Sequence, residues 1–290
     1  MSTIRRGVMG TADIALGIAH LPLLDFGPPE LFDVAARAGY QRVGLRMHSA
    51  APGTKVYPVE RGQVAALRAA ARAAGVEVFD AEFIQLSRDL DVAALDGWMA
   101  TAAELGAKRV NCGASGDDPD LARNAERFGA LCDVAARHGL GVDLEFMRWR
   151  KPVASISDAL EVVTRAGRPN GRILVDLLHV VRSGGTAADL ARVPAQFVGH
   201  VQLCDAPLAA PPEAEIPTEA RERRLPPGEG ELPLVELMNA LPEGVPLSTE
   251  SVSHASLPGV SPLESAIRAR VGALSVLARW RPRDDRATPG

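Results

Sequence analysis

Four side chains that carry a ligating oxygen stand at the ends of apolar runs in the second half of the sequence: Glu145, Asp176, Gln202 and Glu250. The stretch RILVDLLHVVRSG (172–184) is typical, because three apolar residues lead directly into Asp176 and His179 follows three positions later. A buried apolar run has no packing reason to end on an acid. If these side chains converge, they can bind a cation or move protons.

Convergence of the four side chains predicts a bound divalent metal ion. Three carboxylates that met in a pocket of low dielectric constant without a cation would repel one another strongly. Carboxylate and amide oxygens favour a hard or intermediate ion over one that prefers thiolates. We therefore expect one Mn²⁺, with Mg²⁺, Co²⁺ or Zn²⁺ as alternatives, at these strand ends.

Structural roles compete with this interpretation. A single acid at a strand end is most often a helix N-cap or one half of an ion pair, whereas four successive strands that deliver an oxygen to one rim are harder to attribute to capping. His179 can also be a surface histidine, His200 is either a residue that supports a metal ligand or a packed core residue, and Cys204 is expected to fill the core. The first half of the chain adds six candidates at strand ends: His20, Arg46, His48, Asp80, Glu82 and Asn111.

The elements that must position these residues repeat along the chain as a β-branched run, a turn and an alanine-rich amphipathic stretch. Strands are expected at 15–20, 41–47, 76–83, 108–113, 141–147, 172–178, 199–205 and 245–251. Eight such units predict an α/β fold, the (β/α)8 TIM barrel, whose active sites lie at the C-terminal ends of the strands. The rival, an open doubly wound sheet, usually carries a glycine-rich phosphate turn after its first strand, and GIAHLPLLDFGPP contains neither GxGxxG nor GxxxxGKS/T.

No linker divides the chain, so residues 1–290 are expected to form a single domain. The segment 206–229, rich in Pro, Ala and Glu, is too long for a simple turn and is expected to be a functional loop insertion. Residues 281–290 are polar and are expected to form a frayed C-terminal tail.

Composition excludes several classes of partner. The net charge of -4 provides no basic field for nucleic acid or an anionic membrane surface, and no run is long and apolar enough to span a bilayer. The start, MSTIRRGVMG, lacks the apolar region of a signal peptide. Three cysteines without a CxxC pair are typical of a reduced, cytoplasmic protein.

Several stretches together resemble the xylose isomerase-like TIM barrels. They include LLDFGPPELFDVAARAGYQRVGLR, HGLGVDLEFM, ILVDLLHVVRSGG, HVQLCDAP, RRLPPGEGELPL and PLSTES. That family contains sugar isomerases and epimerases, inosose dehydratases and 3-dehydroshikimate dehydratases. The resemblance implies one divalent ion bound at Glu145, Asp176, Gln202 and Glu250, with His179 of the DxxH pair facing the substrate. Ketose epimerases usually have HVH where this chain has HVQ, and the glutamine form followed by a DAP run is similar to the dehydroshikimate dehydratases.

The expected chemistry is proton abstraction next to a carbonyl, with Glu145 and Glu250 as the acid and base. Return of the proton to another carbon or face makes the protein an isomerase or epimerase of a sugar or related polyhydroxy carbonyl compound. Expulsion of a hydroxyl instead makes it a dehydratase of the 3-dehydroshikimate or inosose type, and a non-catalytic sugar-binding barrel is a further alternative. A DNA-repair endonuclease is disfavoured, because strands three and four end without histidines and the chain is acidic.

Basic residues near the expected rim can bind an anionic group of a small-molecule substrate. Bidentate arginine is the natural partner of a carboxylate or phosphate. Arg224, on the 206–229 segment that we expect to close over the substrate, is the first choice, and Arg46 is the second. His179, His20 and His48 complete the expected substrate contacts. A homo-oligomer is left open.

Overall fold

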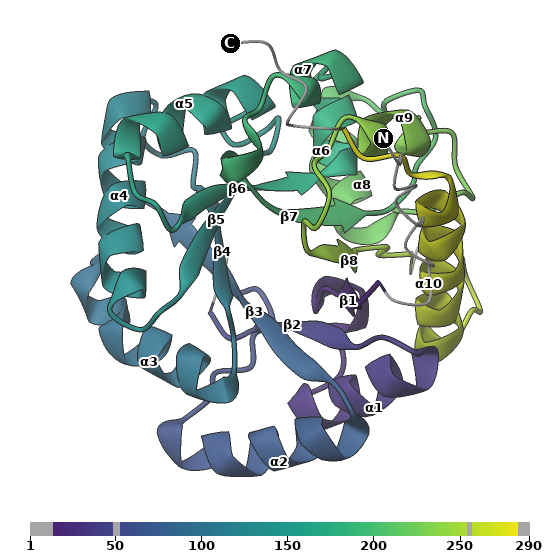
Figure 1. The fold of residues 1–290 in the computed structure, drawn as a ribbon, viewed down its shortest axis with the longest axis horizontal. Helices are drawn as coiled ribbons and strands as arrows, with labels where there is room; N and C mark the ends of the chain where they lie inside the picture. The colour runs from purple at the N-terminus through teal and green to yellow at the C-terminus, as the bar shows by residue number, and fades with distance from the viewer. Residues whose placement is uncertain (1–13, 49–52, 254–256, 284–290) are drawn as a thin grey trace, which may run out of the picture.

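The structure, a computed structural model, describes residues 14–48, 53–253 and 257–283 and confirms the predicted barrel (Figure 1). Each strand pairs in parallel with the next, and the last pairs with the first. The strands are β1 (Leu16–Ile18), β2 (Arg42–Arg46), β3 (Glu77–Leu86), β4 (Arg109–Ala114), β5 (Gly141–Glu145), β6 (Gly171–Asp176), β7 (Val198–Leu203) and β8 (Leu247–Thr249). Every strand therefore falls where a β-branched run predicts one.

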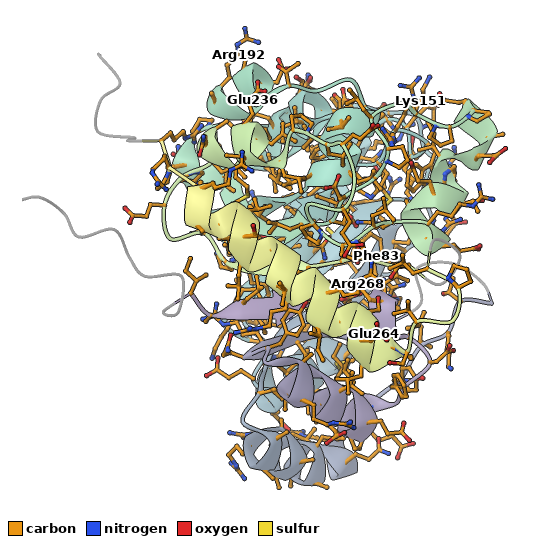
Figure 2. The ribbon with its side chains drawn as sticks, turned by 90° about the vertical axis from the view of Figure 1, so that its right-hand side faces the viewer. Phe83, Lys151, Arg192, Glu236, Glu264 and Arg268 are labelled. Carbon is orange, nitrogen blue, oxygen red and sulfur yellow. The ribbon has the colours of Figure 1, made fainter. Side chains whose placement is uncertain are left out.

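Helices form the outer ring of the barrel (Figure 1). They are α1 (Pro28–Ala38), α2 (Val64–Ala74), α3 (Asp96–Leu105), α4 (Leu121–Ala136), α5 (Ile156–Ala166), α6 (Leu177–Arg182), α7 (Ala187–Ala191), α8 (Ile216–Glu222), α9 (Leu234–Asn239) and α10 (Pro262–Arg279). Helix α10 crosses one side of the barrel obliquely, and its Arg268 pairs with Glu229 at 2.5 Å (Figure 2). None of the helices in the described part of the chain has the length and hydropathy needed to cross a membrane.

Helix α5 shows how local sequence sets these elements. Ser155 caps its N-terminus by accepting from the backbone N–H of Asp158, whose carboxylate accepts in return from the N–H of Ser155. Gly167 ends the helix in the left-handed conformation that glycine adopts without strain. The buried residues recur at helical spacing, at Ile156, Ala159, Val162, Val163 and Ala166.

Two segments differ from their prediction. The sixth strand ends at Asp176, and residues expected to continue it form α6 instead. The expected loop at 206–229 is a folded excursion that contains α8, because the backbone of Asp205 pairs with that of Leu225 and the Asp205 carboxylate accepts from the N–H of Gly228. Most of the expected C-terminal tail lies outside the described residues.

The barrel interior contains charged and polar side chains as well as apolar ones. Arg109 on β4 forms a buried ion pair with Asp143 on β5. His200 on β7 is 1% exposed, and neither ring nitrogen has a hydrogen-bond partner among the described residues. Burial therefore lowers the pKa of His200 from 6.5 to about 4, although the charge of Asp143 opposes this shift. His200 is thus a neutral core residue, as one of the two interpretations of the sequence expects.

His200 should make the protein less stable in mild acid. Between pH 6.5 and about 4, His200 is protonated in the unfolded chain but stays neutral in the folded chain. The stability that depends on neutral His200 is therefore fully present above pH 6.5 and is lost as the pH falls through this range. Urea unfolding at pH 7 and pH 4.5 measures how far the free energy of unfolding falls between the two pH values. In His200→Leu this decrease should be smaller than in the wild type by up to about 3 kcal/mol. Equal losses in the two proteins would show that His200 is protonated in the folded state.

Candidate active site

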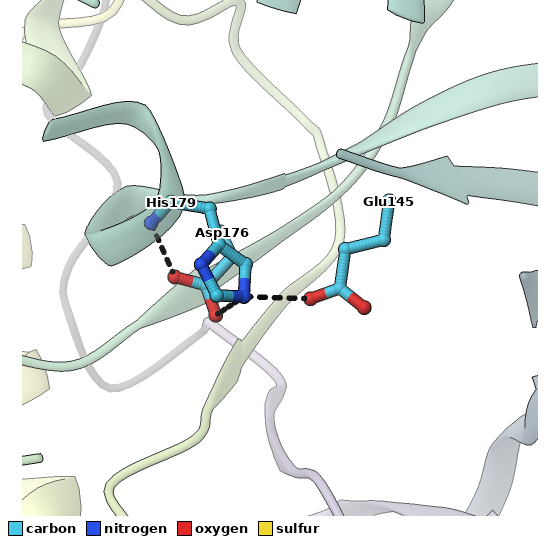
Figure 3. A group of neighbouring side chains, drawn as sticks. All are labelled: Glu145, Asp176 and His179. Carbon is cyan, nitrogen blue, oxygen red and sulfur yellow. Dashed lines mark hydrogen bonds and ion pairs between the residues drawn. The ribbon is translucent and has the colours of Figure 1, made fainter. Parts of the chain in front are cut away.

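Three residues from β5, β6 and α6 converge at the C-terminal rim of the barrel: Glu145, Asp176 and His179 (Figure 3). One potential ligand atom from each lies within 4.8 Å of those of the other two, and all three side chains are buried. Parallel pairing brings the strand ends together, because Glu145 lies beside Leu174 and Asp176 beside Gln202. Two of the four predicted ligands, Glu145 and Asp176, therefore lie in one cluster with His179.

His179 lies between the two acids. Its Nε2 is 3.4 Å from Oε1 of Glu145 and 4.0 Å from Oδ2 of Asp176 (Figure 3). The Trp149 ring meets the imidazole edge-on at 5.2 Å between centroids. Nδ1 is buried without a hydrogen-bond partner among the described residues. His179 is therefore no surface histidine, and one of its nitrogens faces the predicted metal ligands.

Asp176 combines the structural and functional roles that competed in the sequence. Its Oδ1 accepts from the backbone N–H groups of Leu178 (2.8 Å) and His179 (3.3 Å), which makes it the N-cap of α6. Its Oδ2 accepts from the Arg224 guanidinium at 2.5 Å. Burial opposes ionisation, but Arg224 outweighs it together with the cap, so the pKa of Asp176 is lowered. The carboxylate is thus held ionised in a fixed orientation.

Arg224 occupies a different place from the one expected. Instead of lying on an open loop, its side chain is 2% exposed and connects two of the predicted ligands. Nη1 donates to Asp176 and Nη2 to Oε2 of Glu250 at 2.9 Å, while Nε donates to the carbonyl oxygen of Ala220 at 2.6 Å. Such pairing makes Arg224 a built-in counter-ion of the acids, in addition to a residue that lines the pocket.

Glu250 is the most strongly perturbed acid of the rim. Burial raises its pKa well above the usual range, Arg224 opposes the shift, and the charges of Glu145 and Asp176 add to it. The Glu250 carboxyl therefore resists ionisation beside these two acids unless a further cation is present. A divalent ion would remove this conflict.

Gln202 supplies an independent sign that the rim fits a metal ion. Its Oε1 is buried and has no hydrogen-bond partner among the described residues. Leaving a buried acceptor unsatisfied costs about 1–3 kcal/mol, so such atoms usually have a partner or ligand. The clustered ligand atoms are those of Glu145, Asp176 and His179, and Gln202 pairs with Asp176 on the neighbouring strand. Carboxylate, imidazole and amide donors of this kind suit Mn²⁺, Mg²⁺, Co²⁺ or Zn²⁺.

A pocket of about 290 Å³ opens above this rim. Glu145, His179, Arg224 and Glu250 line it, as do Phe83 and Trp149. Arg150, which no pattern in the sequence indicated, also lines the pocket. It is 8% exposed and donates through Nη1 to the carbonyl oxygen of Ala114 at 3.1 Å. Burial lowers the pKa of Arg150; Glu145 opposes the shift, and the nearby Arg221 and Arg46 add to it.

Of the other residues predicted to contact the substrate, Arg46 lines the pocket, whereas His20 and His48 do not. Arg46 lines the pocket, where Glu82 pairs with its guanidinium at 2.9 Å. His20 does not fit the expected role, because its Nδ1 accepts from the backbone N–H of Arg46 and its Nε2 lies 3.0 Å from the carbonyl oxygen of Phe26. Both ring nitrogens therefore have backbone partners, which the sequence could not show. His48 packs edge-on against Trp98 and is not among the residues that line the pocket.

Comparisons with known proteins agree with this architecture. The family model described as the xylose isomerase-like TIM barrel matches residues 32–270. A 3-dehydroshikimate dehydratase of Pseudomonas aeruginosa is 29% identical over 106 residues, which is 37% of this chain and 16% of that protein. A 3-dehydroshikimate dehydratase of Pseudomonas putida is 25% identical over 134 residues, 46% of this chain and 20% of that protein. The matched stretches thus span at most a fifth of these relatives.

Solved structures share the fold at low sequence identity. A fusion of a xylose isomerase-like TIM barrel with a 4-hydroxyphenylpyruvate dioxygenase has a TM-score of 0.76 at 20% identity, over 91% of this chain and 42% of that one. The IOLI protein, solved with a zinc atom, has a TM-score of 0.76 at 17% identity, over 92% of this chain and 99% of that one. A D-psicose 3-epimerase solved with D-fructose has a TM-score of 0.71 at 15% identity, over 91% of this chain and 99% of that one. At these identities the likeness extends to the fold alone.

We expect Gln202→Met to weaken Mn²⁺ binding at least tenfold without lowering the Tm. The change removes the orphaned oxygen and fills its space with an apolar group, which by itself is neutral or stabilising. Calorimetric titration of the metal-free protein measures the affinity, and Asp176→Asn should weaken it as well.

Ser248→Ala is the matched control for this titration. Ser248 lies beside Gln202 on β8, and its hydroxyl is also buried without a partner among the described residues, but it is not a predicted ligand. Its Mn²⁺ affinity should equal that of the wild type. Wild-type affinity in Gln202→Met would remove Gln202 from the ligand set.

Proposed function

Because the chain belongs to the xylose isomerase-like TIM barrel family, we propose that it is a metal-dependent dehydratase of a cyclic hydroxy ketone that carries a carboxylate, of the 3-dehydroshikimate type. The family includes isomerases and epimerases as well as 3-dehydroshikimate dehydratases, so membership alone leaves the reaction open. The observation that favours an anionic substrate is the charge of the pocket wall.

Five cationic side chains line the pocket: Arg46, Lys55, Arg150, Arg221 and Arg224. Three acids oppose them there, Glu145, Glu222 and Glu250, and two of these belong to the predicted metal site. Arg46 and Arg150 are almost buried, so their charges act in a medium that screens them weakly. A substrate carboxylate would relieve the repulsion among the arginines and form charge-assisted hydrogen bonds with them. Neutral ketoses offer no such group.

Residues that line the pocket fit the steps of a dehydration. Glu145, from β5, is placed to accept the proton from the carbon next to the carbonyl. Glu250, which directly follows β8, also lines the pocket and can pass a proton to the departing hydroxyl, which leaves as water. His179 and Trp149 present a buried ring nitrogen each, Nδ1 and Nε1, without a partner among the described residues, and can orient substrate oxygens. A divalent ion bound at the rim would stabilise the negative charge that develops on the carbonyl oxygen.

Sugar isomerisation or epimerisation is the second candidate. The observation in its favour is that two carboxyl groups, Glu145 and Glu250, line the pocket, because one group can remove a proton and a second can return one. The two reactions share the first proton transfer and differ in whether a hydroxyl leaves. The chemistry of the substrate therefore decides between them.

Incubation with 3-dehydroshikimate and Mn²⁺ should give an aromatic dihydroxybenzoate, detected by its near-ultraviolet absorbance. Ketoses and inososes tested alongside should react more slowly, and chelation with EDTA should abolish turnover until Mn²⁺ is restored. Faster conversion of a neutral ketose, with solvent deuterium incorporated next to its carbonyl, would replace the dehydratase with an epimerase.

Glu145→Gln should lower kcat by about 10²- to 10⁴-fold, the usual contribution of a general acid or base. Because Glu145 is also a predicted ligand, the measurement must be made at saturating Mn²⁺ with metal content determined in the same sample. Near-normal kcat in a fully loaded variant would leave Glu145 as a ligand only.

Arg150→Met should raise KM for a carboxylate substrate by about ten- to a hundredfold, the effect expected for the loss of a charged hydrogen bond. KM for the methyl ester of the same substrate should change little. Arg168→Met, which removes an exposed arginine paired with Asp133, is the control and should match the wild type. An unchanged KM for the carboxylate in Arg150→Met would assign the anion contact to another arginine.

A further inference from the structure

A second buried ion pair connects α6 to α8 close to the site. Arg182, the last residue of α6, donates through Nε and Nη2 to the two carboxylate oxygens of Glu219 in α8, each at 2.7 Å. The side chains are 1% and 7% exposed. This bidentate geometry is the most directional that an arginine and a carboxylate can form.

Arg182 also holds the start of the excursion that follows β7. Its Nη2 donates to the carbonyl oxygen of Pro207 at 2.7 Å, and its Nη1 donates to that of Leu208 at 3.2 Å. One guanidinium therefore fixes both the first residues of the excursion and the helix within it. Buried ion pairs contribute little net stability compared with apolar residues of similar volume, so a pair this fully bonded calls for a role in positioning.

The contacts continue from this pair to the centre of the site. Glu219 precedes Ala220, whose carbonyl oxygen accepts from Nε of Arg224 at 2.6 Å. Arg224 in turn contacts Asp176 and Glu250. Asp176 is the N-cap of α6, the helix that ends at Arg182. A single helix thus carries an acid of the site at one end and, at the other, the side chain that fixes the counter-ion of that acid.

We propose that Arg182 and Glu219 form a positioning pair that keeps the Arg224 guanidinium between Asp176 and Glu250. Neither residue lines the pocket, so the pair acts through α8 and Arg224 rather than on a ligand. Loss of the pair would let α8 shift and would change the orientation of both carboxylates. The consequence for turnover rests on the proposed function, whereas the consequences for α8 and for metal affinity do not.

The double variant Arg182→Met/Glu219→Leu tests the proposal, because it removes the pair without leaving a lone buried charge. Its Tm should stay within a few degrees of the wild type. Trypsin should cleave after Arg221 and Arg223 at least tenfold faster, as followed by mass spectrometry, because α8 is no longer held. Mn²⁺ affinity should fall about tenfold, the size of effect typical of residues that orient metal ligands. On an accepted substrate, kcat should fall by about ten- to a hundredfold with KM changed less.

The exposed ion pair between Glu213, on the same excursion, and Arg148, which follows β5, provides the matched control. Glu213→Gln breaks this pair but keeps the hydrogen bond from Nη1 of Arg148 to the carbonyl oxygen of Arg182. It should leave Mn²⁺ affinity and kcat unchanged, since exposed ion pairs contribute little. Arg182→Lys keeps the positive charge but cannot form the two parallel hydrogen bonds of the guanidinium, so it should show the same changes to a smaller extent. This variant replaces the double variant in the test if the double variant does not fold. A folded double variant with wild-type Mn²⁺ affinity would overturn the proposal, even if α8 were cleaved faster. If no substrate turns over in any variant, the proposed function fails, and the affinity measurement still decides the role of the pair.

Discussion

Repulsion among carboxylates that the barrel brings together is the constraint on which the structure of the rim depends. Glu145 and Asp176 end β5 and β6, Glu250 directly follows β8, and parallel pairing in the closed barrel places all three at the same rim. Burial strengthens every charge–charge interaction among them. The protein supplies one cation of its own, Arg224, which contacts two of the three. The unsatisfied oxygen of Gln202 and the raised pKa of Glu250 show that one guanidinium does not satisfy the whole set.

The same constraint explains why structural and functional roles coincide at Asp176. A carboxylate that caps a helix has one oxygen fixed by backbone N–H groups, so its second oxygen points in a defined direction. At Asp176 that direction leads to Arg224 and the cluster. Capping is therefore the means by which β6 and α6 orient a functional oxygen, and the choice between cap and ligand that the sequence posed does not arise.

Local patterns predicted most of the fold and much of the site. β-branched runs marked all eight strands, and strand ends marked Glu145, Asp176 and Gln202, because both signals depend on a few neighbouring residues. Helix α8 was missed because its sequence, IPTEARE, is short and polar with a proline at its second position, and a buried pair with a distant residue stabilises it. Arg150 was missed because RWRK contains three basic residues and nothing local indicates which one turns inward. The backbone partners of the His20 ring are likewise tertiary contacts without a local signal.

The central claim is that the buried acids and Gln202 form one divalent metal site at the C-terminal rim of the barrel. Anomalous diffraction from crystals grown with Mn²⁺ tests it most directly, because the peak locates the ion independently of activity. The account predicts one strong peak within about 2.5 Å of oxygens from Glu145, Asp176, Gln202 and Glu250. Absence of a peak at this rim at saturating Mn²⁺, with Arg224 alone between Asp176 and Glu250, would contradict it.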